Sequence, residues 1–434
     1  MVVRAVGISA VALLGTGMLV VHGPTLLSVS YENSESQKIT ESNTQTSTAT
    51  PQDAVEDTRQ KVAHQALPEA VKALYMSACV AGTPSFRTDL VSLIEQTELN
   101  SVVIDIKDYS GNISFPPQGE TWRPAWLASK CGTKDMSEFI SSMHEKDIFV
   151  IGRITVFQDP FLATRRPDLA VLKGDGSVWK DHKGLSFIDV AADEYWDDII
   201  ELSVEAYNIG FDELNYDYVR YPSDGNMRDI VFPHTQKGQW PHSKPDNLEA
   251  FFSYLHQAMQ DEARFSQMKH TATGREKNIP YISADLFGMT TSNYDDLSVG
   301  QVQERAVPYF DFIAPMVYPS HYPNGWNNYS NPNHYPYEVI HTAMSDGVRR
   351  LQATTTPVAG FTHERIGTTT PAVYQKATST ADKFRTWIQD FDYGGDYGPA
   401  EVRAQIKASY DAGVESWMLW APSNRYTKEA LLLE

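Results

Sequence analysis

The stretch FDELNYDYVRYP, residues 211–222, alternates apolar and polar side chains. In an extended chain its two faces would carry Leu214, Tyr216 and Tyr218 on one side and Glu213, Asn215 and Asp217 on the other. This period of two predicts a β-strand. Four other apolar runs of the chain also end in polar or charged residues. Parallel barrels gather such residues at the carboxyl-terminal mouth of their strands, so we interpret Asp217 as the centre of an active site.

From about residue 67 the chain alternates apolar runs with helical patterns, which predicts strand–helix units and a parallel sheet. Eight strands are expected, over residues 70–78, 101–107, 148–157, 211–221, 279–287, 310–318, 384–391 and 414–421. Helices are expected over residues 89–98, 136–146, 194–209, 248–263, 299–307, 337–351 and 400–412. This count favours an α/β fold, a closed (β/α)8 barrel. The alternative is an open doubly wound sheet, but its GxGxxG turn is missing after the first strand.

The loops that follow the expected strands are long, over residues 108–134, 158–193 and 222–246 and after Pro319. The returns to the next strand, such as residues 145–147 and 208–210, are short. This asymmetry is typical of a barrel whose site lies at one end. A Thr-rich insertion over residues 354–380 is expected to be a surface loop.

The 434-residue chain carries a formal charge of −19 and has a pI near 5.0. Nucleic-acid binding is not expected, because phosphate contacts require clustered Lys and Arg and the sequence has no such cluster. Two cysteines, Cys79 and Cys131, are present, and their positions leave open whether they form a disulfide.

The N-terminus predicts membrane targeting. Residues 2–21 are apolar or small apart from Arg4, so residues 1–24 are expected to be a signal anchor or a signal peptide. Their length favours an uncleaved anchor. Residues 25–66 contain a Ser-, Thr- and Gln-rich stretch and are expected to be a disordered polar linker. Residues 67–434 would then form the barrel, outside the cytoplasm and anchored, or secreted if the segment is cleaved.

An ordered series of motifs runs along the expected barrel: SVVIDIKDYSG, IFVIGRITVFQDPFLATRRPDLAV with a following DGSVW, GFDELNYDYVRYPSDG, ISADLFG, IAPMVYPSHY, WIQDF and SWMLWAPSNRY. This series, over about residues 70–426, resembles a bacterial family of glycoside hydrolases that are exported or membrane-anchored TIM barrels. The resemblance implies a distant relation to α-amylase-like hydrolases, which carry a nucleophile at the end of the fourth strand and an acid on the fifth.

Glycoside cleavage requires two carboxyl groups, so the catalytic candidates are carboxylates at strand ends. Asp217 is the first, and Asp285, in ISADLFG, matches the family's acid position although that position is Glu in the α-amylase-like pattern. Asp105 competes for the second role. A strand-end carboxylate can also cap a helix or pair with Arg. Glu213 lies roughly 13 Å below Asp217 along the strand and is expected in a buried ion pair.

Substrate contacts are expected from polar and aromatic residues near the same strand ends, since sugars offer both hydroxyls and apolar faces. The candidates are Lys107, Arg153, Asn215, Arg220, Tyr318, His321, Gln389 and Trp420. Arg153 would either neutralise Glu213 or hold a sugar hydroxyl. Tyr318 and Trp420 could also be core residues, and His321 a loop hydrogen-bonder.

Other chemistries lack their motifs. The sequence has no HExxH, CxxC pair, GxSxG or P-loop. No organic cofactor or metal is expected, although a structural calcium ion stays open. We interpret the chain as a glycoside hydrolase for an envelope, capsule or biofilm polysaccharide. The rival interpretation is a non-catalytic carbohydrate-binding or envelope scaffold protein on the same barrel.

Overall fold

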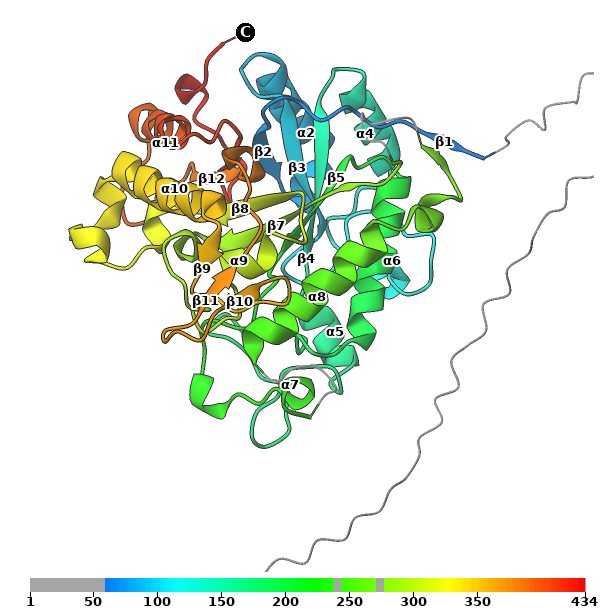
Figure 1. Ribbon diagram of the computed structural model, residues 1–434. Coiled ribbons are helices and arrows are strands. Elements are labelled where there is room, and N and C mark those ends of the chain that lie inside the picture. The colour runs from blue at the N-terminus through cyan, green and yellow to red at the C-terminus, as the bar shows by residue number, and fades with distance from the viewer. Residues whose placement is uncertain (1–58, 238–242, 271–276, 434) are drawn as a thin grey trace, which may run out of the picture. The chain divides into compact units, whose positions relative to one another are not determined.

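The computed structural model describes residues 59–237, 243–270 and 277–433. Within these ranges eight parallel strands pair in the order β12-β13-β2-β3-β4-β5-β7-β8, and the sheet closes on itself (Figure 1). The strands are β2 (Lys72–Met76), β3 (Ser101–Lys107), β4 (Phe149–Thr155), β5 (Glu213–Asp217), β7 (Tyr281–Phe287), β8 (Phe312–Met316), β12 (Thr386–Gln389) and β13 (Trp417–Trp420). The predicted (β/α)8 barrel is confirmed.

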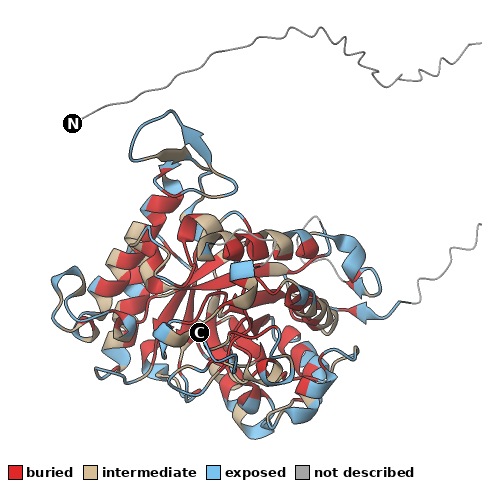
Figure 2. Cartoon of the chain, turned by 90° about the horizontal axis from the view of Figure 1, so that it is seen from below, coloured by how far each residue is buried: buried red, intermediate tan, exposed pale blue. Residues whose placement is uncertain are grey.

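Helices surround the barrel, and α6 lies beside α8 as α10 lies beside α11 (Figure 1). Their bounds are α1 (Ala78–Ala81), α2 (Pro84–Glu95), α3 (Arg123–Ala128), α4 (Met136–His144), α5 (Pro160–Arg165), α6 (Glu194–Asn208), α7 (Pro233–Lys237), α8 (Lys244–Met259), α9 (Gln303–Ala306), α10 (Pro336–Gln352) and α11 (Pro399–Asp411). In α6 the helical period puts Trp196, Ile199 and Ala206 on the buried side. Figure 2 shows this division, with buried residues toward the strands and exposed residues outside.

The expected anchor, and residues 25–58 of the expected linker, lie outside the described residues. Among the helices of the described ranges, none is both long and apolar enough to cross a bilayer. Residues 59–66, the end of the expected linker, are folded onto the barrel. Lys61–Val62 form β1, which pairs with β6 (Lys269–His270), and the buried His64 ring stacks on Tyr207 with centroids 4.1 Å apart. The Gln65 backbone N–H donates to Asp212 at 2.8 Å, so this segment belongs with the barrel.

The interior of the barrel holds both apolar and polar side chains. An apolar cluster fills part of it: Val71, Ala73, Tyr75, Val103, Phe149, Ile151, Ala314, Tyr318, Trp387 and Met418. Two residues along β5 from Glu213 lies Asn215, and two further on lies Asp217, as the period of two requires. Polar side chains of β5 therefore run through the interior from the start of the strand to its carboxyl end.

The Thr-rich insertion contains a small antiparallel sheet. Its strands β9 (Thr355–Thr356), β10 (Glu364–Ile366) and β11 (Val373–Gln375) pair in the order β10-β11-β9. β10 is fully exposed, which agrees with the expected surface position.

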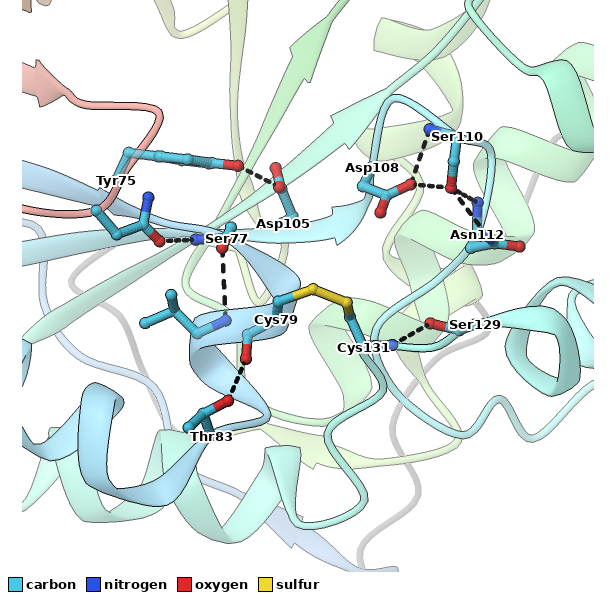
Figure 3. The surroundings of a disulfide bond; sticks show 12 residues. Tyr75, Ser77, Cys79, Thr83, Asp105, Asp108, Ser110, Asn112, Ser129 and Cys131 are labelled. Atoms are coloured by element: carbon cyan, nitrogen blue, oxygen red, sulfur yellow. Dashed lines mark hydrogen bonds between the residues drawn. A yellow bond between two sulfur atoms is a disulfide. The ribbon is translucent and has the colours of Figure 1, made fainter. Parts of the chain in front are cut away.

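A disulfide joins Cys79 in α1 to Cys131 in the loop after α3 (Figure 3). Their Cα atoms are 4.3 Å apart, although 52 positions separate them in sequence. The bond links the long loop that follows β3 to α1, the short helix directly after β2. It settles the pairing that the cysteine positions alone left open.

Candidate active site

A pocket of about 380 Å³ opens at the carboxyl ends of the barrel strands. It is lined by Arg153, Lys183, Asp217, Tyr218, Arg220, Ser223, Asp224, Asp285, Phe287, Gly288, Met289, Met316, Tyr318, His321, Tyr322, Trp387 and Trp420. Seven of the residues expected from the sequence are among them. This volume lies in the range of small-ligand sites.

Arg153, on β4, holds three carboxylates together. Its Nη1 donates to Asp105 Oδ1 at 2.7 Å, its Nη2 pairs with Asp217 Oδ2, and its Nε lies 3.7 Å from Asp285 Oδ2. Because a guanidinium group is only a few Å across, the contacting oxygens lie within roughly 9 Å of one another, which does not exceed the upper limit of ~9.5 Å for glycosidase carboxyl pairs. The expected alternative, in which Arg153 neutralises Glu213, is wrong, since Glu213 pairs with Arg385.

One guanidinium group cannot balance three buried negative charges, so the protonation of the carboxylates is divided. Burial and the neighbouring Asp217 charge raise the pKa of Asp285 to about 8. Burial also raises the pKa of Asp105. Burial acts to lower the pKa of Arg153, but Asp217 and Asp105 outweigh it, so Arg153 stays cationic. At neutral pH the site thus holds a protonated Asp285 beside Asp217, the acid and base pattern of paired carboxyl groups.

Asp217 ends β5 and is fixed through both of its oxygens. Oδ2 pairs with Arg153, and Oδ1 accepts the backbone N–H of Tyr218 at 2.5 Å. Tyr218 has a φ of 53°, in the left-handed region that a bulky residue seldom adopts. This turn directs its N–H back at Asp217, and such strain is often found at functional sites.

Asp285 is held differently, through a single oxygen. Its Oδ1 accepts Trp387 Nε1–H at 2.7 Å and Asn215 Nδ2–H at 3.0 Å. Within the described residues no hydrogen bond reaches Oδ2, whose nearest cationic neighbour is Arg153. Oδ2 is therefore the oxygen placed to carry a transferable proton.

Asp105 lies beneath this pair and does not line the pocket. Tyr75 donates its hydroxyl to Asp105 Oδ2 at 2.5 Å (Figure 3), while Oδ1 accepts from Arg153. Both oxygens are thus bound to protein groups. The geometry makes Asp105 a residue that positions Arg153, and leaves Asp285 as the second carboxyl group of the pocket.

A buried network supports the two pocket carboxyl groups from below. Arg385 donates to both oxygens of Glu213 at 2.5 Å, and Ser283 donates to Glu213 Oε1 at 2.7 Å. Asn215 in turn donates to Ser283 at 3.0 Å and to Asp285. The expected ion pair of Glu213 is confirmed, and Asn215 acts below the pocket rather than in its lining.

Lys107 was expected at the site but points elsewhere. Its ammonium lies 3.0 Å from Asp159 and donates to the Thr155 carbonyl at 2.7 Å, fully buried. The register between β3 and β4 shifts between Asp105 and Lys107, so the two residues do not share a face as regular alternation requires.

Gln389 also fails to line the pocket, although it lies on β12 two residues after Trp387. Its Oε1 accepts the Ser320 N–H at 3.1 Å, and its Nε2 donates to the Phe391 carbonyl at 3.0 Å. Because the side-chain amide bonds to two loop backbones, Gln389 braces the loops around the site.

Aromatic side chains form one wall of the pocket. Trp387 and Trp420 pack at right angles with ring centroids 5.7 Å apart, and Tyr318 lies in the same lining. The Tyr318 ring also packs on His321 at 5.2 Å. Trp387 was missed from the sequence. Trp387 comes two residues before Gln389 in β12, so both residues lie on the same face of the strand. Because Gln389 was expected at the site, this spacing could have indicated Trp387.

The described residues include no group of three His, Cys, Asp or Glu side chains arranged to hold a metal ion. The groups that converge in the pocket include carboxyls, two guanidinium groups, an ammonium, an imidazole and aromatic rings. A (β/α)8 barrel with close, unequally protonated carboxyl groups at its mouth is the construction of a glycoside hydrolase.

The family comparison agrees with this class. The model of a family described as "Putative glycosyl hydrolase domain" matches residues 73–426, most of the chain. The protein belongs to this family, and it is a glycosidase. No curated protein matches the sequence.

The chain is similar to several solved structures, and the first of those described below has the same fold. The glycoside hydrolase domain of PgaB (BpsB) from Bordetella bronchiseptica has a TM-score of 0.53 and 10% identity, over 84% of this chain and 98% of its own. A hypothetical protein from Ruminiclostridium thermocellum is 27% identical over 46% of this chain and 96% of its own, with a TM-score of 0.39. The catalytic domain of a β-amylase from Paenibacillus polymyxa is 11% identical over 85% of this chain and 95% of its own, with a TM-score of 0.45.

Proposed function

We propose that this protein hydrolyses an envelope, capsule or biofilm polysaccharide outside the cytoplasm, with Asp285 as general acid and Asp217 as the group that acts on the anomeric carbon. The observation that carries the proposal is the pair itself. Asp285 is protonated at neutral pH because burial and Asp217 raise its pKa to about 8, and Asp217 is paired with Arg153.

In this reaction Asp285 gives its proton to the glycosidic oxygen as the bond from that oxygen to C1 breaks. The bonding electron pair leaves with the oxygen. Asp217 either forms a bond to C1, which water later hydrolyses, or takes a proton from the water that attacks C1. In the first case the ionised Asp285 takes a proton from that water and is restored. In the second case Asp217 releases the proton it took to solvent, and Asp285 takes a proton from solvent.

The compartment and the polymer are inferred from three features. The apolar segment over residues 2–21 predicts export, and the polar stretch after it would keep the barrel near a membrane. The Cys79–Cys131 disulfide supports an oxidising compartment. A hydrolase tethered there meets the polymers of the cell envelope and its surroundings.

The test is a polysaccharide panel digested with a fragment of residues 58–434. Reducing ends released from envelope, capsule and biofilm polymers would be compared with those from storage polymers such as starch. Asp217→Asn and Asp285→Asn should each abolish most of the release. Asp159→Asn is the matched control, because it removes a buried carboxylate at the start of α5 that pairs with Lys107 outside the pocket.

The control should lower stability and keep the rate per folded molecule within about tenfold. Release from storage polymers alone would contradict the proposed substrate class. Binding of a polymer without any release by the unsubstituted fragment would favour the non-catalytic interpretation.

A further inference from the structure

Arg220 differs from the other buried arginines of the described residues. Arg153, Arg350 and Arg385 each pair with at least one carboxylate. Arg220 is also buried, with 9% of its surface exposed, but no Asp or Glu of the described ranges forms an ion pair with it. Its Nη1 donates to the Tyr221 carbonyl at 3.0 Å. Asp217, Asp224 and Asp181 act on Arg220 only at longer range, so burial still lowers its pKa. A buried guanidinium group without a direct ion pair carries a desolvation cost that an arriving anion would offset.

Arg220 lines the same pocket as the two carboxyl groups. Two guanidinium nitrogens of Arg385 are fully buried and have no hydrogen-bond partner, whereas no nitrogen of Arg220 is in that situation. Its guanidinium carbon lies 4.7 Å from the Tyr218 ring centroid and 4.8 Å from that of Phe287. Both rings also line the pocket. Aromatic faces hold a guanidinium group in place while leaving its N–H groups free to donate.

A second cation extends this side of the pocket. Lys183, from the long loop after β4, is exposed and belongs to the lining. The lining charges Asp217 and Arg153 are already engaged with each other. Arg220 and Lys183 therefore supply positive charge that forms no ion pair within the described residues, although the carboxylates of Asp217, Asp224 and Asp181 partly offset that of Arg220.

We propose that Arg220, assisted by Lys183, forms a subsite for the carboxylate of an acidic sugar, so that the natural substrate is a hexuronic-acid-containing polysaccharide. This inference rests on the proposed glycosidase function and narrows its substrate class. A planar carboxylate presents two oxygens to the N–H fork of one guanidinium group, a match that a neutral hydroxyl lacks. The subsite lies beside the catalytic pair, so the acidic sugar would occupy a position at or next to the bond that is cleaved.

The test measures binding, so that it does not depend on turnover. Asp285→Asn provides the background, because it replaces a carboxyl that is neutral at pH 7 and leaves the pocket charge unchanged. Ligands are pairs of oligosaccharides of the same linkage, one with hexuronic acids and one with those carboxyl groups reduced to hydroxymethyl groups. Sulfated and phosphorylated oligosaccharides form a third arm. Calorimetric Kd values would be compared at low and high salt.

We expect at least one acidic oligosaccharide to bind ~10- to 100-fold more tightly than its reduced partner, as charge-assisted hydrogen bonds provide. The added substitution Arg220→Gln should remove this preference, and salt should weaken it. Arg228→Gln is the matched control, since Arg228 is exposed on the same loop and does not line the pocket. It should keep the preference.

Equal affinity within every pair, or a preference that survives Arg220→Gln, would overturn the inference. Tighter binding of sulfated or phosphorylated ligands than of every hexuronide would overturn the assignment to a carboxylate. Melting curves check folding, and Arg220→Gln should not lower the melting temperature by much because it removes an unpaired charge. Hydrolysis by the unsubstituted fragment is measured separately, so failure of this subsite and failure of the glycosidase function give different results.

Discussion

Asp285→Asn should make the protein more stable at neutral pH while it removes the proposed acid. In the folded protein the carboxyl has a pKa of about 8, and in the unfolded chain it has the ordinary value of about 3.9. A pKa raised by folding contributes stability that is complete below pH ~4 and is lost as pH rises toward 8. The amide of Asn does not titrate, so the variant escapes this loss.

The size of the effect follows from the difference between the two pKa values. At pH 7 the unfolded chain has released its proton and the folded chain still holds it, which costs about 4 kcal/mol as an upper estimate. Asn keeps an oxygen that can accept from Trp387 and Asn215. Loss of the hydroxyl donor would cost about 1 kcal/mol at any pH. The net gain should therefore be about 2 to 3 kcal/mol at pH 7 and slightly negative at pH 4.

The assay is urea denaturation of residues 58–434 and of the variant at several pH values between 4 and 8.5. Other buried titratable groups are common to both proteins and cancel in the difference. Asp217→Asn provides a further check, because loss of the like charge should lower the pKa of Asp285 and flatten the pH dependence. A stability difference that is constant with pH, or that falls as pH rises, would refute the reasoning.

The same variant tests the acid role through the leaving group. Aryl glycosides with good leaving groups need little proton donation, so Asp285→Asn should slow them much less than polysaccharide substrates. Equal losses on both kinds of substrate would remove Asp285 from the acid role.

The remaining predictions concern Asp217, the disulfide and the start of the folded unit. Asp217→Asn should reduce turnover on the order of a thousandfold or more while substrate still binds; a variant with a lower melting temperature and a rate within about tenfold would remove Asp217 from the mechanism. Replacing both Cys79 and Cys131 by Ser should lower the free energy of unfolding by up to about 4 kcal/mol, since the bond closes a loop of 52 positions; unchanged urea midpoints would show that the bond contributes nothing. A fragment from residue 67 should be less stable than one from residue 58 by about 2 kcal/mol, because it lacks the buried His64 and the Gln65–Asp212 hydrogen bond; equal stability would assign residues 59–66 to the linker.

The sequence by itself determined the barrel and the central residues of its site. Period-two alternation is a local property, so residues 211–222 indicated which side of β5 carries Asp217 and Asn215. The same reasoning placed Asp285 at the end of another strand. When parallel strands close into a barrel, their carboxyl ends meet at one mouth, independently of the loop conformations. The pocket at this mouth contains the carboxyl groups of Asp217 and Asp285.

Only the tertiary structure decided contacts that depend on register and on distant partners. The irregularity in β3 turns Lys107 away from the pocket, and local alternation cannot reveal such a shift. Arg153 contacts three carboxylates while Glu213 takes Arg385, 172 positions away, because the closed sheet brings these strands together. Trp387 gains its role only through the hydrogen bond to Asp285. The protonation of Asp285 likewise follows from burial and from the nearby Asp217, which exist only once the barrel has closed.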